Sequence, residues 1–279
     1  MSKVKELFGI YYQCIKNHLD NIETQWCPYS KKKCYKIRKS NPDISIGTCS
    51  VQYKDESIII CPYRLLENNQ IFIDCLHLLT NHEPGNELYI IPEVTIPGGH
   101  VDYFLVSAKN SKVKDFLGIE LQTMDTTGTV WPERQKLLYE NGFNVEPNEF
   151  SKDRAFGMNW KMTAKTILIQ MHHKAETFEA LNKHLVLIIQ DPFYQYMASE
   201  FTFSHFNKNA SLGDSVHIHS YNFWDTNEKM RLDLKRRTST DAKGIALSLG
   251  LNATPQVDFV QLVQLLESRL LDEYRLTLW

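Results

Sequence analysis

The feature that most limits the fold of this 279-residue sequence is the distribution of its six cysteines, all within the first 75 residues. Four of them occupy a polar, lysine-rich, turn-prone stretch with little apolar material of its own: Cys27, Cys34, Cys49 and Cys61. In a reducing compartment, clustered cysteines more often bind metal or pack as small apolar side chains than form disulfides. A bound metal would supply the cohesion this stretch lacks; unrelated reduced cysteines are the alternative.

Four thiolates suit a tetrahedral structural site for zinc, and the same geometry holds a single iron. Two of the cysteines share a local context, Cys-Pro-Tyr at 27–29 and again at 61–63, which indicates similar ligand turns. The spacing contains no Cys-x-x-Cys pair, so it is less specific than that of a zinc finger. We predict a metal-binding module over residues 23–63, with Cys14 and Cys75 packed in the core.

Composition restricts the class of protein further. With 43% hydrophobic and 23% charged residues, the chain has the balance of a folded globular protein. Its formal net charge of −2 indicates no overall basic surface, so nucleic acid would be contacted through local patches such as residues 31–39 and 235–237. The sequence has no apolar run of the ~20 residues that span a membrane and no signal-like N-terminus, which predicts a cytoplasmic protein.

Hydrophobic periodicity predicts a mixed α/β fold. Helices are expected over 2–22, 64–80 with a break near Asn68 and Asn69, 131–142, 159–183 and 256–273. Strands are expected over 88–91, 101–106, 116–122, 185–189 and, less distinctly, 215–221. This order predicts an N-terminal helix (1–22), the cysteine module (23–63) and one domain with a C-terminal extension (64–279).

The strands at 101–106 and 116–122 are expected to form a hairpin. If its turn centres on Ser111, residues whose numbers sum to about 222 face each other, which places Asp102 opposite Glu120. Gln122 then lies on the same face as Glu120. Two adjacent buried carboxylates are costly unless a cation lies between them, and Mg²⁺ prefers carboxylates, waters and phosphate oxygens. The alternative is a solvated hairpin end with both carboxylates at its rim.

The order helix, three strands, long helix, strand resembles the αβββαβ core of PD-(D/E)XK nucleases. Asp102 takes the place of the motif aspartate, Glu120 that of the second acidic residue, and Gln122 stands where most members have lysine. Three segments resemble the NotI-like type II restriction endonucleases: PEVTIPGGHVDYFLV (92–106), IELQTMDTTG (119–128) and NWKMTAK (159–165). That family also carries a four-cysteine metal motif ahead of its nuclease core.

The resemblance implies a Mg²⁺-dependent, site-specific endonuclease that leaves 5′-phosphate ends. Asp102 and Glu120 would bind Mg²⁺ and Gln122 would position the attacking water. Glu93 would assist that water or be a solvated loop residue. The missing lysine leaves open which group supplies positive charge, with Lys161 or Lys165 as candidates that are alternatively phosphate contacts or solvated.

The resemblance also implies partners. These are palindromic double-stranded DNA, a second copy of the chain in a homodimer, a cognate DNA methyltransferase that protects host sites, and one structural zinc or iron. Residues 193–206 and the terminal helix are candidates for the dimer interface. Two alternatives remain: a repair or structure-specific nuclease of the same fold, and a non-catalytic, metal-stabilised DNA-binding protein.

Overall fold

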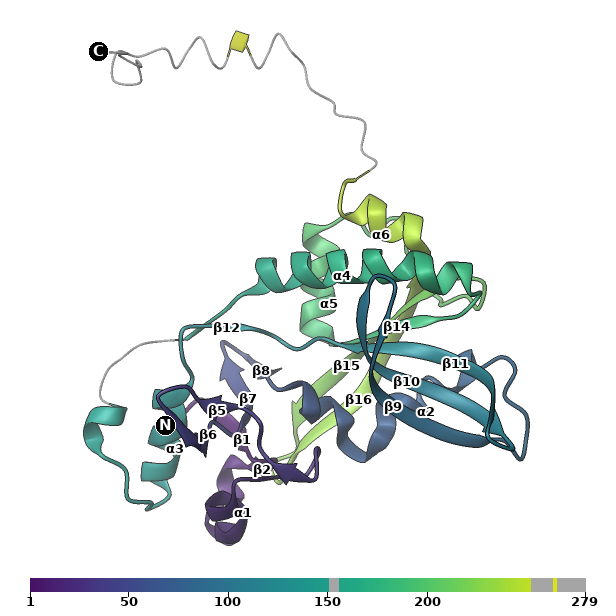
Figure 1. Ribbon diagram of the computed structural model, residues 1–279. Coiled ribbons are helices and arrows are strands. Elements are labelled where there is room, and N and C mark those ends of the chain that lie inside the picture. The colour runs from purple at the N-terminus through teal and green to yellow at the C-terminus, as the bar shows by residue number, and fades with distance from the viewer. Residues whose placement is uncertain (151–155, 252–262, 265–279) are drawn as a thin grey trace, which may run out of the picture.

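A computed structural model describes residues 1–150, 156–251 and 263–264 of the chain. Its centre is a six-stranded mixed sheet in the order β16-β15-β14-β11-β10-β9 (Figure 1). Strand β14 pairs in parallel with both β11 and β15, and the other neighbours are antiparallel. The strands are β9 (Glu87–Ile96), β10 (Gly99–Lys109), β11 (Lys112–Leu121), β14 (Leu185–Gln190), β15 (Val216–Asp225) and β16 (Met230–Thr240). The prediction of a mixed α/β fold is therefore confirmed.

The hairpin of β10 and β11 has the predicted register. Tyr103 pairs with Ile119 and Phe104 with Gly118, so paired residue numbers sum to 222. The turn residues Asn110 and Ser111 both have positive φ, at 52° and 58°, as a two-residue hairpin turn that follows the twist of its strands requires. Beside this turn the paired numbers sum to 221, and a register shift between Ser107 and Ala108 changes the sum to 222, so the turn and the shift together set which residues meet at the far end of the hairpin.

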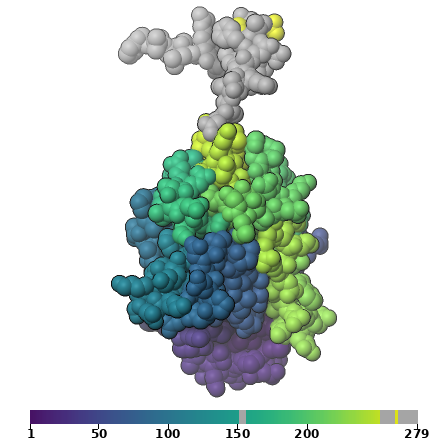
Figure 2. Space-filling model, turned by 90° about the vertical axis from the view of Figure 1, so that its right-hand side faces the viewer, coloured from purple at the N-terminus to yellow at the C-terminus, as the bar shows by residue number. Residues whose placement is uncertain are grey.

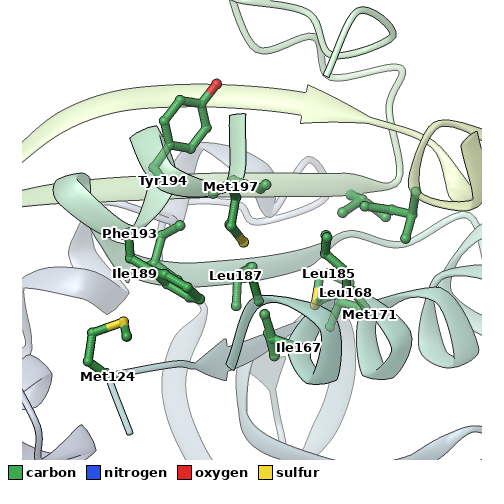
Figure 3. Packing of buried hydrophobic residues seen from close by; sticks show 14 of the residues in the cluster. Met124, Ile167, Leu168, Met171, Leu185, Leu187, Ile189, Phe193, Tyr194 and Met197 are labelled. Atoms are coloured by element: carbon green, nitrogen blue, oxygen red, sulfur yellow. The ribbon is translucent and has the colours of Figure 1, made fainter. Parts of the chain in front are cut away.

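Helices cover both faces of the sheet, and β14 lies between them. All six residues of β14 are buried, as expected for a parallel strand in the middle of a sheet. One face is covered by α4 (Trp160–Ala180), α5 (Asp191–Glu200) and α6 (Ala242–Ser248). Figure 3 shows Ile167 and Leu168 of α4 beside Leu187 of the strand. The other face packs on η2 (Pro62–Asn69), α2 (Gln70–Ile73) and η3 (Leu76–Leu78).

The prediction of one helix over residues 2–22 is wrong. The segment forms β1 (Val4–Leu7), β2 (Ile10–Tyr11), the 3-10 helix η1 (Tyr12–Asn17) and α1 (Leu19–Thr24). Phe8 and Gly9 both have positive φ, which ends β1 in a turn, and β1 then pairs with β7 (Thr48–Tyr53). Pairing with a distant strand overrides the helical spacing of the apolar residues, because it buries Val4 and Leu7 completely.

The N-terminal residues and the cysteine stretch form one sheet, in the order β2-β1-β7-β8, with β8 at Glu56–Ile59. In Figure 2 the purple N-terminal residues gather at one end of the molecule, below the blue residues. The short strands of this region are β3 (Trp26–Cys27), β4 (Lys32–Lys33), β5 (Ile37–Arg38) and β6 (Asn41–Ser45). The remaining elements are β12 (Thr126–Thr127), α3 (Trp131–Glu140), η4 (Pro147–Glu149) and β13 (Gly157–Met158).

Two of the predicted helices are present in the structure, and a third is divided into short helices. The helices at 131–142 and 159–183 correspond to α3 and α4. The region 64–80 is three short helices, and its break falls where predicted, with positive φ at Asn68 and Asn69. The helix α5 and the strand β16 were not predicted, and the helix at 256–273 lies outside the described residues. None of the helices that the structure describes has the length and apolar character needed to span a membrane.

Two buried histidines lie on β15, on the side that packs against η3. His217 and His219 are fully buried, and Nδ1 of His219 lies 3.6 Å from Sγ of Cys75. Burial, followed by the neighbouring charge of His184, lowers the pKa of His217 to about 4. Burial and the charge of Arg237 lower the pKa of His219 to about 2. Both side chains are therefore neutral in the folded protein.

These lowered pKa values predict loss of stability in acid. Above pH 6.5 both histidines are neutral in the folded and unfolded chains, but as the pH falls below 6.5 only the unfolded chain binds protons readily. Each histidine should then cost about 2 kcal/mol of unfolding free energy between pH 7.5 and pH 5. His219→Gln should remove one such loss, which urea unfolding at the two pH values measures. Equal acid losses in wild type and variant would contradict this assignment.

Candidate active site

The end of the hairpin brings two carboxylates together. Asp102 on β10 and Glu120 on β11 occupy the positions next after the pair Tyr103 and Ile119. Oδ2 of Asp102 accepts a 2.8 Å hydrogen bond from the backbone N–H of Leu121, across the two strands. Glu120 is buried and Asp102 is half-buried. The structure thus places both residues side by side, as the hairpin register predicts.

A lysine that the sequence did not single out completes the cluster. Lys174 of α4 is 4% exposed, and its Nζ lies 2.6 Å from Oε1 of Glu120. The two charged side chains form a buried ion pair. Lys161 and Lys165, the candidates proposed from the sequence, lie exposed on the same helix. Lys174 occupies a position in the apolar stripe of α4, three residues after Met171 and four before Phe178, and this signal could have identified it.

The turn between β9 and β10 holds Lys174 in place. Gly98 has φ of 97° and lies so close to α4 that a Cβ there would be 2.2 Å from the carbonyl oxygen of His173. The next residue, Gly99, would place a Cβ 3.4 Å from Cε of Lys174. Thr177 also donates a 2.9 Å hydrogen bond from Oγ1 to the carbonyl of Pro97. A glycine is needed at 98 because only a residue without a side chain permits this close approach, and at 99 because φ is 131°, a conformation that residues with side chains rarely adopt.

Burial and neighbouring carboxylates disfavour the charged forms of Glu120 and Asp102. Burial, and then the charge of Asp102, raises the pKa of Glu120 to about 7, although Lys174 opposes the shift. Burial also raises the pKa of Asp102, while the N–H of Leu121 and the charge of Lys174 lower it. The single ammonium group of Lys174 therefore pairs with Glu120 and acts on Asp102 through its charge, in a site with little access to water. A divalent cation fits this donor set, since it would stabilise the charged forms of two carboxylates whose pKa values are raised mainly by burial.

The other two predicted residues lie at the same end of the hairpin. Gln122 follows β11, is half-buried, and donates from Nε2 to the carbonyl of Thr123 at 2.6 Å. Glu93 is exposed on β9 with φ of 52°, a strained conformation for a residue with a side chain. Glu93 and Asp102 line the same pocket, whose volume is about 220 Å³. The pocket is lined by Tyr35, Pro62, Tyr63, Glu93, Asp102, Tyr103 and Leu121.

The four cysteines of the predicted module are all buried and free. They lie on β3, after β4, on β7 and after β8. Burial raises the pKa of the Cys34, Cys49 and Cys61 thiols, and charge on the other cysteines adds to each shift. Within the described ranges, no three His, Cys, Asp or Glu side chains are arranged as ligands of one metal ion. Cysteine thiolates are ligands of the type that zinc and iron accept.

Backbone N–H groups point to these thiols. Those of Lys36 and Gly47 hydrogen bond to Cys34 and lower the pKa of its thiol, and that of Tyr63 does the same for Cys61. The N–H of Gly9 likewise lowers the pKa of the Cys49 thiol. Such hydrogen bonds favour the charged thiolate, which is the form that binds metal. Of the other two cysteines, Cys75 is buried in the core as predicted, and Cys14 is only partly buried.

The two basic patches differ in the structure. Lys31, Lys32 and Lys33 are exposed in the cysteine module. The second patch is not a free cationic surface, because Arg236 binds both carboxylate oxygens of Asp191, at 2.6 and 3.0 Å. Its neighbours are Arg237, which donates to the carbonyl of Asp74, and Lys235, which lines an open pocket.

The sequence matches a known protein family. The family model described as Restriction endonuclease NotI matches residues 21–213, a span that includes the cysteine module, the hairpin, α4 and β14. No curated protein matches the sequence. Because the matched span covers more than half of the chain and contains the whole carboxylate cluster, the chain belongs to the NotI restriction endonuclease family.

Proposed function

We propose that this restriction endonuclease hydrolyses double-stranded DNA with Mg²⁺, leaves 5′-phosphate ends, and is built on a PD-(D/E)XK core. Membership of the NotI family makes DNA its substrate class. The proposed Mg²⁺ chemistry is supported by the cluster of Asp102, Glu120 and Lys174. In this cluster the ammonium group of Lys174 on α4 meets the two carboxylates at the end of the hairpin. Phosphodiester hydrolysis needs a cation site of this kind beside a source of positive charge.

The proposed roles follow from the chemistry of each side chain. Asp102 and Glu120 would hold Mg²⁺, which when bound activates a water and neutralises charge on the phosphate. Gln122 would orient the attacking water through hydrogen bonds, because a neutral amide supplies no positive charge. Glu93, in the same pocket as Asp102, would accept a hydrogen bond from that water. Lys174 would supply the positive charge that lysine provides at the Gln122 position in most PD-(D/E)XK nucleases.

Digestion of a sequenced genome tests this function. With Mg²⁺, the protein should produce discrete fragments, and mapping their ends gives the recognition sequence, the overhang and the 5′-phosphate. A smear, or preference for branched DNA, would instead indicate a repair or structure-specific nuclease. DNA binding without cleavage at any Mg²⁺ concentration would indicate a non-catalytic DNA-binding protein and would refute the proposed chemistry.

Substitution of Lys174 separates its role from that of the other lysines on α4. Lys174→Met should lower the single-turnover cleavage rate by at least about a hundred-fold at saturating Mg²⁺, since it removes a fixed positive charge from the site. Lys165→Met, an exposed position on the same helix, should cleave like wild type. The rates are measured on a labelled oligonucleotide that contains the mapped site. Equal rates for the two variants would remove Lys174 from the mechanism.

We also propose that the cysteine module binds one zinc or iron through Cys27, Cys34, Cys49 and Cys61. Support comes from four buried, free cysteines in one short stretch of the chain, and from the backbone N–H groups that lower the pKa of three of them. The metal would hold together the short strands β3 to β6, most of which have only two residues. A cytoplasmic location would suit such a site, because cysteines stay reduced there.

A homodimer on palindromic DNA is the proposed assembly. Two-fold symmetric DNA is matched most simply by a two-fold symmetric protein. The edge strand β9 supports a self-pairing surface, since it exposes four consecutive large apolar residues: Leu88, Tyr89, Ile90 and Ile91. Sedimentation velocity of the protein bound to its mapped site measures the stoichiometry.

A cognate methyltransferase is also proposed, and DNA methylated in the source cells should then resist digestion.

A further inference from the structure

Two tyrosines from the cysteine module reach the carboxylate pocket. Tyr35 directly follows Cys34, and Tyr63 lies two residues after Cys61. Their rings meet edge to face, with centroids 4.9 Å apart and an interplanar angle of 85°. Together they line the pocket that also contains Glu93 and Asp102. The module is thus not remote from the chemistry, because its cysteine turns bring aromatic side chains to the site.

The size of this pocket restricts what it can hold. A volume of 220 Å³ corresponds to about seven water molecules, at roughly 30 Å³ each. That space can hold a phosphodiester group together with a hydrated cation. A second pocket of about 390 Å³ shares Tyr63, Glu93 and Tyr103 with the first but is not lined by Asp102. The flanking nucleotide therefore has room beyond the phosphate.

Hydrogen-bond donors for a phosphate are scarce in the smaller pocket. Its described lining contains no lysine or arginine, and the side chains that can donate are the hydroxyls of Tyr35, Tyr63 and Tyr103. None of these three hydroxyls has a hydrogen-bond partner within the described part of the chain. A tyrosine hydroxyl is protonated at neutral pH and donates well to an anionic oxygen. The carboxylates, in contrast, would attract a phosphate only through a cation between them.

We propose that Tyr35 and Tyr63 bind the scissile phosphate by donating hydrogen bonds from their hydroxyls to its non-bridging oxygens. The inference rests on the proposed nuclease function and adds substrate-binding residues to it. In this arrangement the cysteine module forms one wall of the active site. Tyr35 is the more accessible of the two, at 46% exposed, and is the better first target.

Hydroxyl deletion tests the proposal without removing the aromatic pair. Tyr35→Phe should lower the single-turnover cleavage rate at saturating DNA and Mg²⁺ by about ten-fold or more, the usual effect of losing one hydrogen bond to a charged group. Tyr63→Phe should have a similar effect. Tyr139→Phe is the matched control, because Tyr139 is exposed (53%) on α3 and lines neither pocket. It should cleave like wild type.

A phosphorothioate at the mapped cleavage site distinguishes phosphate binding from a structural role. Sulfur accepts hydrogen bonds weakly, so in one of the two stereoisomers it should slow wild type by more than it slows Tyr35→Phe. A structural role would lower the variant's rate equally on both substrates, and that result would overturn the proposal. Metal content and melting temperature should be unchanged in the variant, because the ring is retained.

The outcomes separate the two proposals. If wild type cleaves and both phenylalanine variants cleave at the wild-type rate, the tyrosines do not bind the phosphate, while the nuclease function stands. If wild type cleaves no DNA with Mg²⁺, the proposed function fails and this inference fails with it. Slower cleavage by the variants, with a smaller phosphorothioate effect, supports both.

Discussion

Asp102→Asn should abolish DNA cleavage while leaving the fold and DNA binding intact. The loss in single-turnover rate should be at least about a thousand-fold, because the amide cannot replace a carboxylate ligand of Mg²⁺. The fold should survive because the asparagine side-chain oxygen can still accept the hydrogen bond from the N–H of Leu121. Removing the charge also relieves the repulsion that raises the pKa of Glu120. Glu120→Gln should abolish cleavage too.

The measurement combines cleavage of the mapped site with a gel-shift assay of the same oligonucleotide in Ca²⁺. Asp55→Asn is the control, since Asp55 is an exposed carboxylate outside the pocket, and it should cleave like wild type. Cleavage by Asp102→Asn at the wild-type rate would remove the hairpin carboxylates from the mechanism. Loss of DNA binding together with cleavage would indicate a damaged fold, which circular dichroism would detect.

Cys34→Ser should lower both the metal content and the stability of the protein. Purified wild type should contain about one zinc or iron per chain, because four thiolates make one tetrahedral site. Binding of a structural metal contributes on the order of 10 kcal/mol to folding in small zinc domains, so loss of one of four ligands should cost several kcal/mol. Elemental analysis and urea unfolding measure the two effects.

Cys14→Ser is the matched control for this substitution. Cys14 lies in the same N-terminal region but outside the proposed ligand set, and its side chain is only partly buried. This variant should keep its metal and most of its stability. Wild type that contains no metal and is unaffected by chelators would contradict the metal site. The four cysteines would then be reduced core residues.

Local sequence patterns predicted the parts of the site that depend on neighbouring strands. The turn at Asn110 and Ser111, together with the one-residue register shift between Ser107 and Ala108, places Asp102 beside Glu120. The apolar run of β14 likewise identifies a buried central strand. These inferences held because each depends on contacts between residues close in sequence or on a regular period.

The same patterns failed where distant contacts decide the structure. Residues 4–7 have helical spacing but form β1, because pairing with β7 buries them more completely. Arg236 lies in a basic run but is bound by Asp191, 45 residues earlier in the chain. No local rule predicts such a partner. The strand β16 was missed because its alternating polar residues are typical of a loop as well as of an outer strand.

The sequence by itself determined the order of the central strands and the long helix α4, the hairpin that carries Asp102 and Glu120, and the position of four cysteines ahead of that hairpin. Only the tertiary structure brought Lys174 to Glu120 and Tyr35 to the carboxylate pocket. Lys174 is 54 residues from its partner in the chain, and Tyr35 is 67 residues from Asp102. Side chains that far apart meet only through packing of whole elements, here α4 against the turn at Gly98 and the cysteine module against the end of the sheet.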